Sequence, residues 1–195
     1  MTYNLTLKRN RQQKTNYRKR AALLLSRSYF IVAKISDQNV SCQVLKPTIK
    51  GDVVICSAHS RELRKYGWKG SMNSLPACYL TGFLLGKKSI VNATNNAILY
   101  TGTYSFTSRV AACLKGIVRA GVNVPVSEDN LPTDDRTSGK HIAEYAKILK
   151  TDEAKYNSMF STLIKDGLKP EDYPSHFEAI KHKISEDFSS KVKSD

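Results

Sequence analysis

The feature that most constrains the fold is a change of hydrophobic periodicity partway along the chain. Residues 29–35 are rich in β-branched and aromatic side chains, and residues 40–45 alternate apolar and polar side chains with a period of two. Turn-forming residues 36–39 separate these two segments, so an antiparallel hairpin is predicted, and residues 52–58 are expected to form a third strand. Helical spacing then replaces the strand pattern from about residue 75 onward.

Two helices and a short strand complete the predicted core. One helix is expected over residues 75–90, a fourth strand over residues 96–101, and a second helix from about residue 108 to Gly121. The apolar residues of the second helix follow the spacing i, i+3, i+4, i+7 and i+8, and they are Val110, Cys113, Leu114, Ile117 and Val118. This succession of strands and helices predicts an α/β fold with a mixed sheet.

A basic segment precedes the core. Residues 1–14 contain few core-forming side chains and are expected to form an extended arm. A helix is predicted to begin at Thr15 and to continue to about residue 27. Its expected apolar face, which would dock the helix on the core, consists of Tyr17, Ala21, Leu24 and Leu25.

A helical region follows the core. Apolar residues at helical spacing predict helices over residues 141–150, 152–165 and 175–188. The chain is therefore divided into a basic N-terminal arm, an α/β core and a helical C-terminal region, which cover residues 1–14, 15–136 and 137–195.

Charge is distributed unevenly along the chain. The net charge of +14 consists of +8 in residues 1–30, +9 in residues 31–120 and −3 in residues 121–195. The first 30 residues contain eight basic side chains and no acidic one. This balance favours nucleic acid as the partner over an anionic membrane surface, because the chain has no long basic amphipathic helix. No apolar run approaches the roughly 18 residues that span a bilayer, and no signal peptide is expected, so no membrane partner is predicted.

The sequence offers little for catalysis. A nuclease on such a core needs several carboxylates that converge on the sheet, but residues 1–120 contain only Asp37, Asp52 and Glu62. His59 has no GxSxG nucleophile motif to serve. The four cysteines lack CxxC spacing and lie in apolar runs, so reduced and buried thiols are expected. No metal, cofactor or small-molecule substrate is predicted, and a nuclease-like RNA-processing enzyme is the alternative to an RNA-binding protein.

Short motifs in a fixed order carry a resemblance to a known family. The most distinctive motif is Tyr66-Gly67-Trp68-Lys69-Gly70. The others, in chain order, include Thr15-x-Tyr17-x-x-Arg20, Leu24-Leu25-Ser26-Arg27, Ser57-Ala58-His59-Ser60, Tyr79-Leu80-Thr81-Gly82, Gly86-Lys87-Lys88 and Ser108-Arg109-Val110. Over about residues 5–150, this series resembles the archaeal and eukaryotic type of the universal large-subunit ribosomal protein family L-eighteen.

The resemblance implies a fold, a location and a set of partners. The implied fold is a three-layer α/β core with a ribonuclease-H-like arrangement that lacks the catalytic acids. The implied location is the central protuberance of the large ribosomal subunit, in the cytoplasm, where proteins of this family bind 5S ribosomal RNA (rRNA). The other implied partners are large-subunit rRNA, the universal ribosomal protein L-five and further large-subunit proteins.

Cationic and aromatic side chains are predicted to make the RNA contacts. The planar fork of arginine can bridge phosphate oxygens or stack on a base, and aromatic rings can stack on exposed bases. The first set of expected contacts is Lys8, Arg9, Arg11, Lys14, Tyr17, Arg18, Arg20 and Arg27. A second set consists of Trp68, Lys69 and Arg109, and Trp68 is interpreted equally well as a core residue.

Overall fold

The computed structural model describes residues 6–192, with side chains described as far as residue 189. Its strands are β1 (Tyr29–Ile35), β2 (Val40–Thr48), β3 (Gly51–His59) and β4 (Ala97–Leu99). Its α-helices are α1 (Lys8–Arg11), α2 (Tyr17–Leu24), α3 (Leu75–Val91), α4 (Ser108–Ala120), α5 (Asp134–Ser138), α6 (Lys140–Leu149), α7 (Glu153–Met159), α8 (Ser161–Lys165) and α9 (Tyr173–Val192). The 3-10 helices are η1 (Ser60–Tyr66), η2 (Glu128–Asn130) and η3 (Pro170–Asp172).

The four strands form one mixed sheet in the order β3-β2-β1-β4. Strand β2 pairs antiparallel with both β1 and β3, whereas β4 pairs parallel with β1. The predicted hairpin with its turn at residues 36–39 is therefore confirmed. Strand β4 is shorter than the predicted 96–101, although the backbone N–H of Tyr100 still donates to the Ile31 carbonyl at 2.8 Å.

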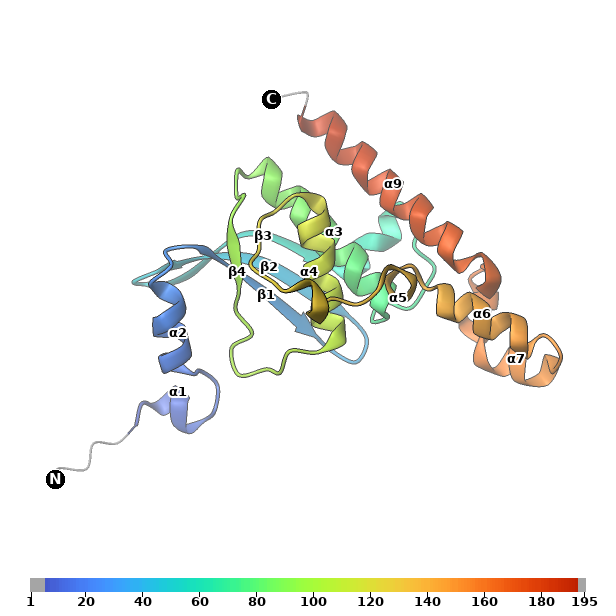
Figure 1. Cartoon of the computed structure of the whole chain (residues 1–195), viewed down its shortest axis with the longest axis horizontal. Helices are drawn as coiled ribbons and strands as arrows, with labels where there is room; N and C mark the ends of the chain where they lie inside the picture. The colour runs from blue at the N-terminus through green and yellow to red at the C-terminus, as the bar shows by residue number, and fades with distance from the viewer. Residues whose placement is uncertain (1–5, 193–195) are drawn as a thin grey trace.

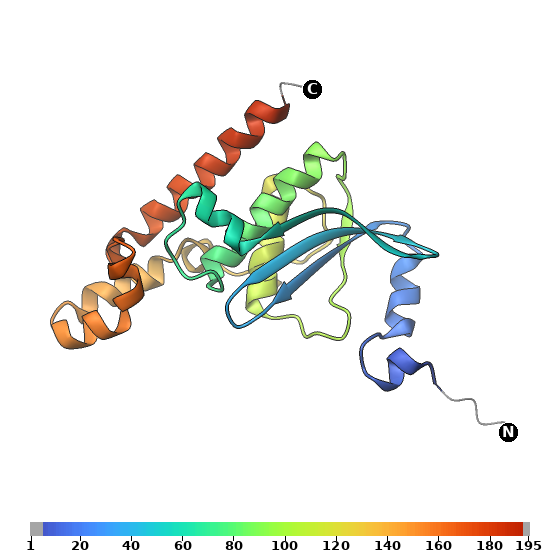
Figure 2. The same cartoon turned by 180° about the vertical axis from the view of Figure 1, so that it is seen from behind.

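Helices α3 and α4 form a layer against one face of the sheet, as Figures 1 and 2 show from opposite sides. Helix α3 lies on β2 and β3, and α4 lies on β1. The side chains buried between these layers include Ile31, Val44, Leu80, Leu84 and Ile117. The mixed α/β class is confirmed, because the segments predicted as strands form the sheet and the segments with helical spacing cover it.

Helices α3 and α4 approach each other unusually closely. A methyl group added at Gly82 would lie 2.0 Å from the carbonyl oxygen of Cys113, and one added at Gly116 would lie 2.2 Å from that of Tyr79. Each glycine therefore lets the backbone of one helix contact the backbone of the other. This contact sets the close spacing of α3 and α4 within the helical layer.

The C-terminal helix α9 contributes to the same hydrophobic core. It packs on α3 and η1, and Figure 1 shows it running along one side of the molecule, from the end where α6 and α7 lie toward the C-terminus. Its buried side chains include Phe177, Ile180 and Ile184, and the Phe177 ring lies 5.4 Å from that of Tyr79. The expected helical C-terminal region is present, and its packing on α3 is consistent with three layers. A domain boundary near residue 137 stays a prediction.

The start of the N-terminal segment differs from the prediction of an extended arm. Residues 8–11 form the short helix α1, and residues 1–5 lie outside the described part of the chain. Helix α2 is capped by Asn16, whose side-chain oxygen accepts a hydrogen bond from the Lys19 N–H at 3.0 Å. The prediction that Thr15 caps this helix is therefore wrong.

The expected docking face of α2 is also wrong. Leu24 is 40% exposed and Leu25 is 84% exposed, and α2 contains no buried residue. The face of the sheet that α2 approaches presents Val32, Lys34, Gln43 and Leu45, and neither Leu24 nor Leu25 is buried against it. Polar contacts hold α2 in place instead, and they define the candidate site.

The buried cysteines allow a direct test of the core. Cys42, Cys78 and Cys113 are fully buried and unpaired by disulfides, as expected. Hydrogen bonding with the two neighbouring thiols, together with burial, raises the pKa of the Cys113 thiol. We expect maleimide labelling of Cys113 in the native protein to proceed only at the rate of unfolding, because both burial and a raised pKa suppress the reactive thiolate. Labelling of native protein as fast as that of the urea-unfolded chain would contradict this packing.

Candidate nucleic-acid interface

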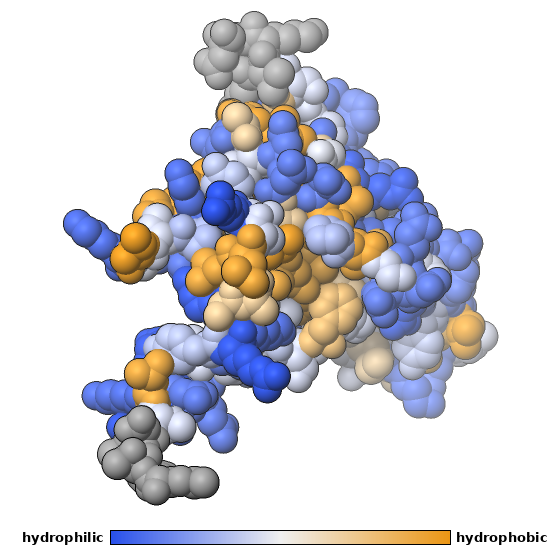
Figure 3. Space-filling model, turned by 60° about the vertical axis from the view of Figure 1, so that its left-hand side comes forward, coloured by the Kyte–Doolittle hydropathy of each residue, from blue (hydrophilic) through white to orange (hydrophobic). Residues whose placement is uncertain are grey.

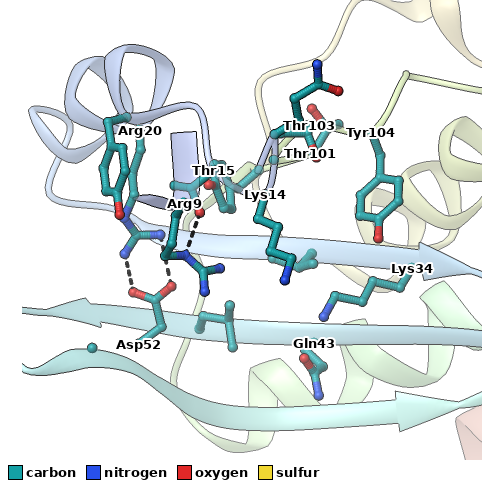
Figure 4. Close-up of a pocket in the computed structure, with 17 residues that line it drawn as sticks. Arg9, Lys14, Thr15, Arg20, Lys34, Gln43, Asp52, Thr101, Thr103 and Tyr104 are labelled. Carbon is teal, nitrogen blue, oxygen red and sulfur yellow. Dashed lines mark hydrogen bonds and ion pairs between the residues drawn. The ribbon is translucent and has the colours of Figure 1, made fainter. Parts of the chain in front are cut away.

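A groove of about 720 Å³ lies between the N-terminal helices and the face of the sheet opposite α3 and α4. Its walls come from residues 9–20, from β1 and β2, from the start of β3 and from the loop at residues 100–104. Figure 4 shows these segments converging, although they are far apart in the sequence. Figure 3 shows the molecule turned toward this side, with a hydrophobic area in the middle of the face and hydrophilic residues around it.

The groove is cationic and aromatic. Its ionisable lining includes the basic residues Arg9, Lys14, Arg20 and Lys34 and a single carboxylate, that of Asp52. Its aromatic lining consists of Tyr17, Tyr100 and Tyr104. Cations matched with aromatic rings suit a ligand that carries both phosphates and planar bases.

An ion pair between Arg20 and Asp52 joins α2 to the sheet. The guanidinium of Arg20 donates two hydrogen bonds to the carboxylate, one of them spanning 3.0 Å from Nη1 to Oδ2. It also lies 5.7 Å from the ring centre of Phe30 and 5.5 Å from that of Tyr100, which is cation–π distance. The carboxylate of Asp52 is the main cause of the raised pKa of Arg20. We call Arg20, Asp52, Phe30 and Tyr100 the clamp.

Two further hydrogen bonds support the same arrangement. The ammonium group of Lys19 donates to the hydroxyl of Thr101 at 2.8 Å, and Nε of Arg9 donates to the hydroxyl of Thr15 at 3.0 Å. Because α2 buries no side chain and isolated helices of its length are marginal in water, these contacts and the clamp set its position. Arg20 was predicted as a phosphate contact, but in the free protein its guanidinium is engaged by Asp52.

The clamp predicts an effect of Asp52→Asn on RNA binding that is opposite to the effect expected from net charge alone. Changing Asp52→Asn removes a negative charge from a cationic groove, yet we expect it to weaken RNA binding about fivefold, or ~1 kcal/mol. The amide no longer forms a charged bidentate pair, so α2 loses its fixed position and must be ordered on binding. Asp37→Asn, in the turn at residues 36–39, is the matched control and should leave affinity unchanged or slightly raised. Tighter binding by Asp52→Asn, measured by filter binding at fixed salt, would rule out the clamp.

The other expected contacts on α1 and α2 lie on the surface of these helices. Lys8, Arg11 and Arg18 are exposed, as is Arg27 just beyond the end of α2. Together with Arg9, Lys14, Tyr17 and Arg20, which line the groove, they give the N-terminal side of the molecule its basic character, and we call this set of residues the basic region. Whether each one contacts RNA stays a prediction.

The second set of expected contacts does not gather at the groove. Trp68 is only 3% exposed, stacks on His176 with ring centres 5.2 Å apart and meets Tyr173 edge to face. Its interpretation as a core residue is the one that the structure supports, because this ring has no surface for a base. Lys69 lies beside it, and its backbone N–H donates to Nε2 of His176 at 3.2 Å.

Arg109 lies closer to the groove. It donates a hydrogen bond to Asn73 and lines an adjacent pocket of about 410 Å³ at the start of α4. Lys34 and Tyr104 line both this pocket and the groove, so the two hollows share a wall.

Sequence reasoning missed Lys34 and Tyr104 as residues of the candidate site. Lys34 had a signal, because a lysine within a β-rich run marks a strand face that meets solvent, whereas Tyr104 lies in a loop without a pattern.

The residues weighed for catalysis have structural partners or lie apart. His59 caps η1, since its Nδ1 accepts from the Arg61 N–H while Glu62 accepts from the His59 N–H. Among residues 6–192, no three His, Cys, Asp or Glu side chains are grouped as they would be in a metal site. Within the same range, no helix has the length and apolar character needed to cross a membrane.

A small mixed α/β protein with a basic N-terminal region and a cation-lined groove belongs to the nucleic-acid-binding class. Residues 1–109 match the family described as ribosomal large subunit proteins 60S L5 and 50S L18. The chain is also 45% identical over 187 residues to the large ribosomal subunit protein uL18 of Thermofilum pendens, which covers 94% of this chain and 95% of that protein. The chain belongs to the uL18 family of large-subunit ribosomal proteins, so the resemblance in its motifs is confirmed.

Membership of this family fixes the general role. The protein is a structural constituent of the large ribosomal subunit, and it is located in the cytoplasmic ribosome. It associates there with ribosomal RNA and with other ribosomal proteins. It is not an enzyme, so the alternative of a nuclease-like RNA-processing enzyme is rejected.

Proposed function

We propose that the protein binds 5S rRNA and anchors it in the central protuberance of the large subunit, beside the universal ribosomal protein L-five. The observation that carries this proposal is the basic region formed by α1, α2 and the groove. Large-subunit rRNA is the second proposed RNA partner. The proposed contact with L-five rests on the family resemblance.

The charge of the N-terminal segment suits a folded RNA. Double-helical RNA is recognised mainly by its shape and its phosphates, which asks for cations placed at defined positions. Lys8, Arg11 and Arg18 project from two short helices, so their spacing is set by helical geometry. The clamp holds α2 against the sheet before the RNA arrives, which lowers the ordering cost of binding.

The negative net charge of the C-terminal third supports the same orientation. Residues 121–195 carry a net charge of −3, so this part of the surface repels phosphates on average. The RNA is therefore expected to meet the N-terminal side, with the helices α6 to α9 turned toward other components of the subunit.

Competition between RNAs tests the proposal. The full-length protein is titrated against a labelled 5S rRNA transcript, with unlabelled 5S rRNA or a transfer RNA as the competitor at equal salt. Because specific sites exceed non-specific ones by large factors, we expect 5S rRNA to compete at least about a hundredfold better. Equal competition by the two RNAs would mean that the basic region binds RNA without selecting 5S rRNA.

A further inference from the structure

We infer that the groove between α1, α2 and the sheet takes a single unpaired nucleotide of the bound RNA. This inference rests on the proposed function for the identity of the RNA, but the groove itself specifies the kind of ligand. The surface of α1 and α2 would contact phosphates of a helix, whereas the groove would accept one base that is not paired.

The size of the groove favours one nucleotide over a helix. Its volume of about 720 Å³ lies within the range of roughly 300–1,000 Å³ that small-molecule sites have. A base, its ribose and the flanking phosphates fit that volume. A base-paired helix has two strands and stacked pairs, so it can meet only the rim of such a hollow.

The aromatic residues of the groove differ in what they can still bind. The Tyr100 ring already packs on Phe30 and on the guanidinium of Arg20. Tyr104, in contrast, is 71% exposed, and among the described residues no ring or cation is recorded against it. Figure 4 shows it projecting from the loop toward β1 at the end of the groove where Lys34 lies. An exposed ring at a groove wall is a platform on which a base can stack.

Cations and an amide complete the set of groups that a nucleotide needs. Lys14 and Lys34 line the groove and are exposed, and within residues 6–192 their ammonium groups have no ion pair. They can meet the phosphates on either side of the base. The half-buried amide of Gln43 lies on the floor between them and offers both a donor and an acceptor to the edge of a base.

The clamp removes the one group that would oppose this ligand. Asp52 is the carboxylate at the groove, and an unpaired carboxylate there would repel phosphates. Its two oxygens accept from Arg20, so its charge is balanced within the wall. The remaining lining therefore presents a positive field to an incoming nucleotide.

Substitution of Tyr104 separates stacking from charge. Tyr104→Phe keeps the ring, Tyr104→Ala removes it, and Tyr145→Ala removes a tyrosine of α6 that is 45% exposed and far from the groove. Each full-length variant is titrated with the 5S rRNA transcript, with a single-stranded pentanucleotide of uridine and with a blunt RNA duplex, across a salt series. Free uridine monophosphate is the fourth probe, which distinguishes a nucleotide within a chain from a free one. Ultraviolet crosslinking with mass spectrometry then identifies the nucleotide joined to Tyr104.

We expect Tyr104→Ala to weaken binding of both 5S rRNA and the pentanucleotide about tenfold, without a change in salt dependence, because stacking releases no counterions. Tyr104→Phe and Tyr145→Ala should bind like the unchanged protein, duplex binding should not respond to Tyr104, and the crosslink should fall on an unpaired nucleotide. Free uridine monophosphate should bind more weakly than the pentanucleotide.

Equal binding of 5S rRNA and the pentanucleotide by Tyr104→Ala and the unchanged protein would overturn the inference, as would a crosslink within a base-paired helix. Both results leave 5S rRNA binding itself intact. Conversely, ring-dependent binding of the pentanucleotide without selective binding of 5S rRNA would support the groove and refute the proposed function.

Discussion

Replacing Gly82 by alanine is expected to destabilise the protein by at least about 3 kcal/mol. The added methyl group would lie 2.0 Å from the carbonyl oxygen of Cys113 and 2.8 Å from its carbonyl carbon. These are backbone atoms of α4, so no side-chain rotation can relieve the contact and the two helices must separate. Gly116→Ala should have a similar effect through the backbone of Tyr79 and Phe83.

The direction of this effect is opposite to that of helix propensity. Alanine in place of glycine within a helix normally adds about 1 kcal/mol to stability. The matched comparison is Gly86→Ala, whose methyl would lie 2.5 Å from the Cβ of Ala120. Adding Ala120→Gly removes that methyl contact, so the double variant should recover part of the stability lost by Gly86→Ala.

The stability of Gly82→Ala, Gly116→Ala, Gly86→Ala and the double variant is measured by urea unfolding. The unfolding is followed by circular dichroism. The close approach of α3 and α4 predicts a large fall in the unfolding midpoint for Gly82→Ala and Gly116→Ala. Midpoints equal to or above that of the unchanged protein would contradict the packing of the helical layer.

Removing six cations from the N-terminal side is expected to change the salt dependence of RNA binding strongly. Deletion of residues 1–14 removes Lys8, Arg9, Arg11 and Lys14, and substitution by glutamine neutralises Arg18 and Arg27. Each phosphate contact contributes about −0.7 to −0.9 to the slope of log affinity against log salt. If about four of the six cations reach phosphates, the slope should flatten by about 3. Arg20 is left unchanged, because its loss would break the clamp as well as remove a charge.

A control that removes three cations from the C-terminal third distinguishes local contacts from net charge. Lys147, Lys155 and Lys165 are exposed in the C-terminal third, and their change to glutamine removes three cations far from the groove. This variant should retain the slope of the unchanged protein in filter binding. A slope that changes equally per charge in both variants would mean that overall charge, and not the N-terminal side, governs binding.

Local sequence patterns predicted most of the fold. The three segments predicted as strands, 29–35, 40–45 and 52–58, lie in β1, β2 and β3, and the helix predicted over residues 75–90 is α3. The amphipathic spacing of α4 was equally clear. The close spacing of α3 and α4 was not predictable in the same way. The contact of Gly82 with α4 depends on two helices that meet only in the folded chain.

The candidate site was predictable in its charge but not in its construction. The absence of acids in the first 30 residues predicted that the N-terminal side would be basic. The ion pair of Arg20 with Asp52 joins residues 32 positions apart, so no local sequence pattern predicts it. Leu25 shows the reverse case: helical spacing suggested burial, yet the side chain is 84% exposed. Trp68 had two equal interpretations, and only its tertiary neighbours decide between them.

Lysine footprinting tests most directly whether RNA binds at α1, α2 and the groove. Full-length protein is acylated with a limiting amine reagent in the presence and absence of 5S rRNA, and the modified lysines are quantified by mass spectrometry. RNA bound at α1, α2 and the groove should protect Lys8, Lys14 and Lys34, while Lys147, Lys155 and Lys165 remain as reactive as in the free protein. Protection of the C-terminal lysines, with Lys14 and Lys34 still reactive, would contradict RNA binding at the N-terminal side of the molecule.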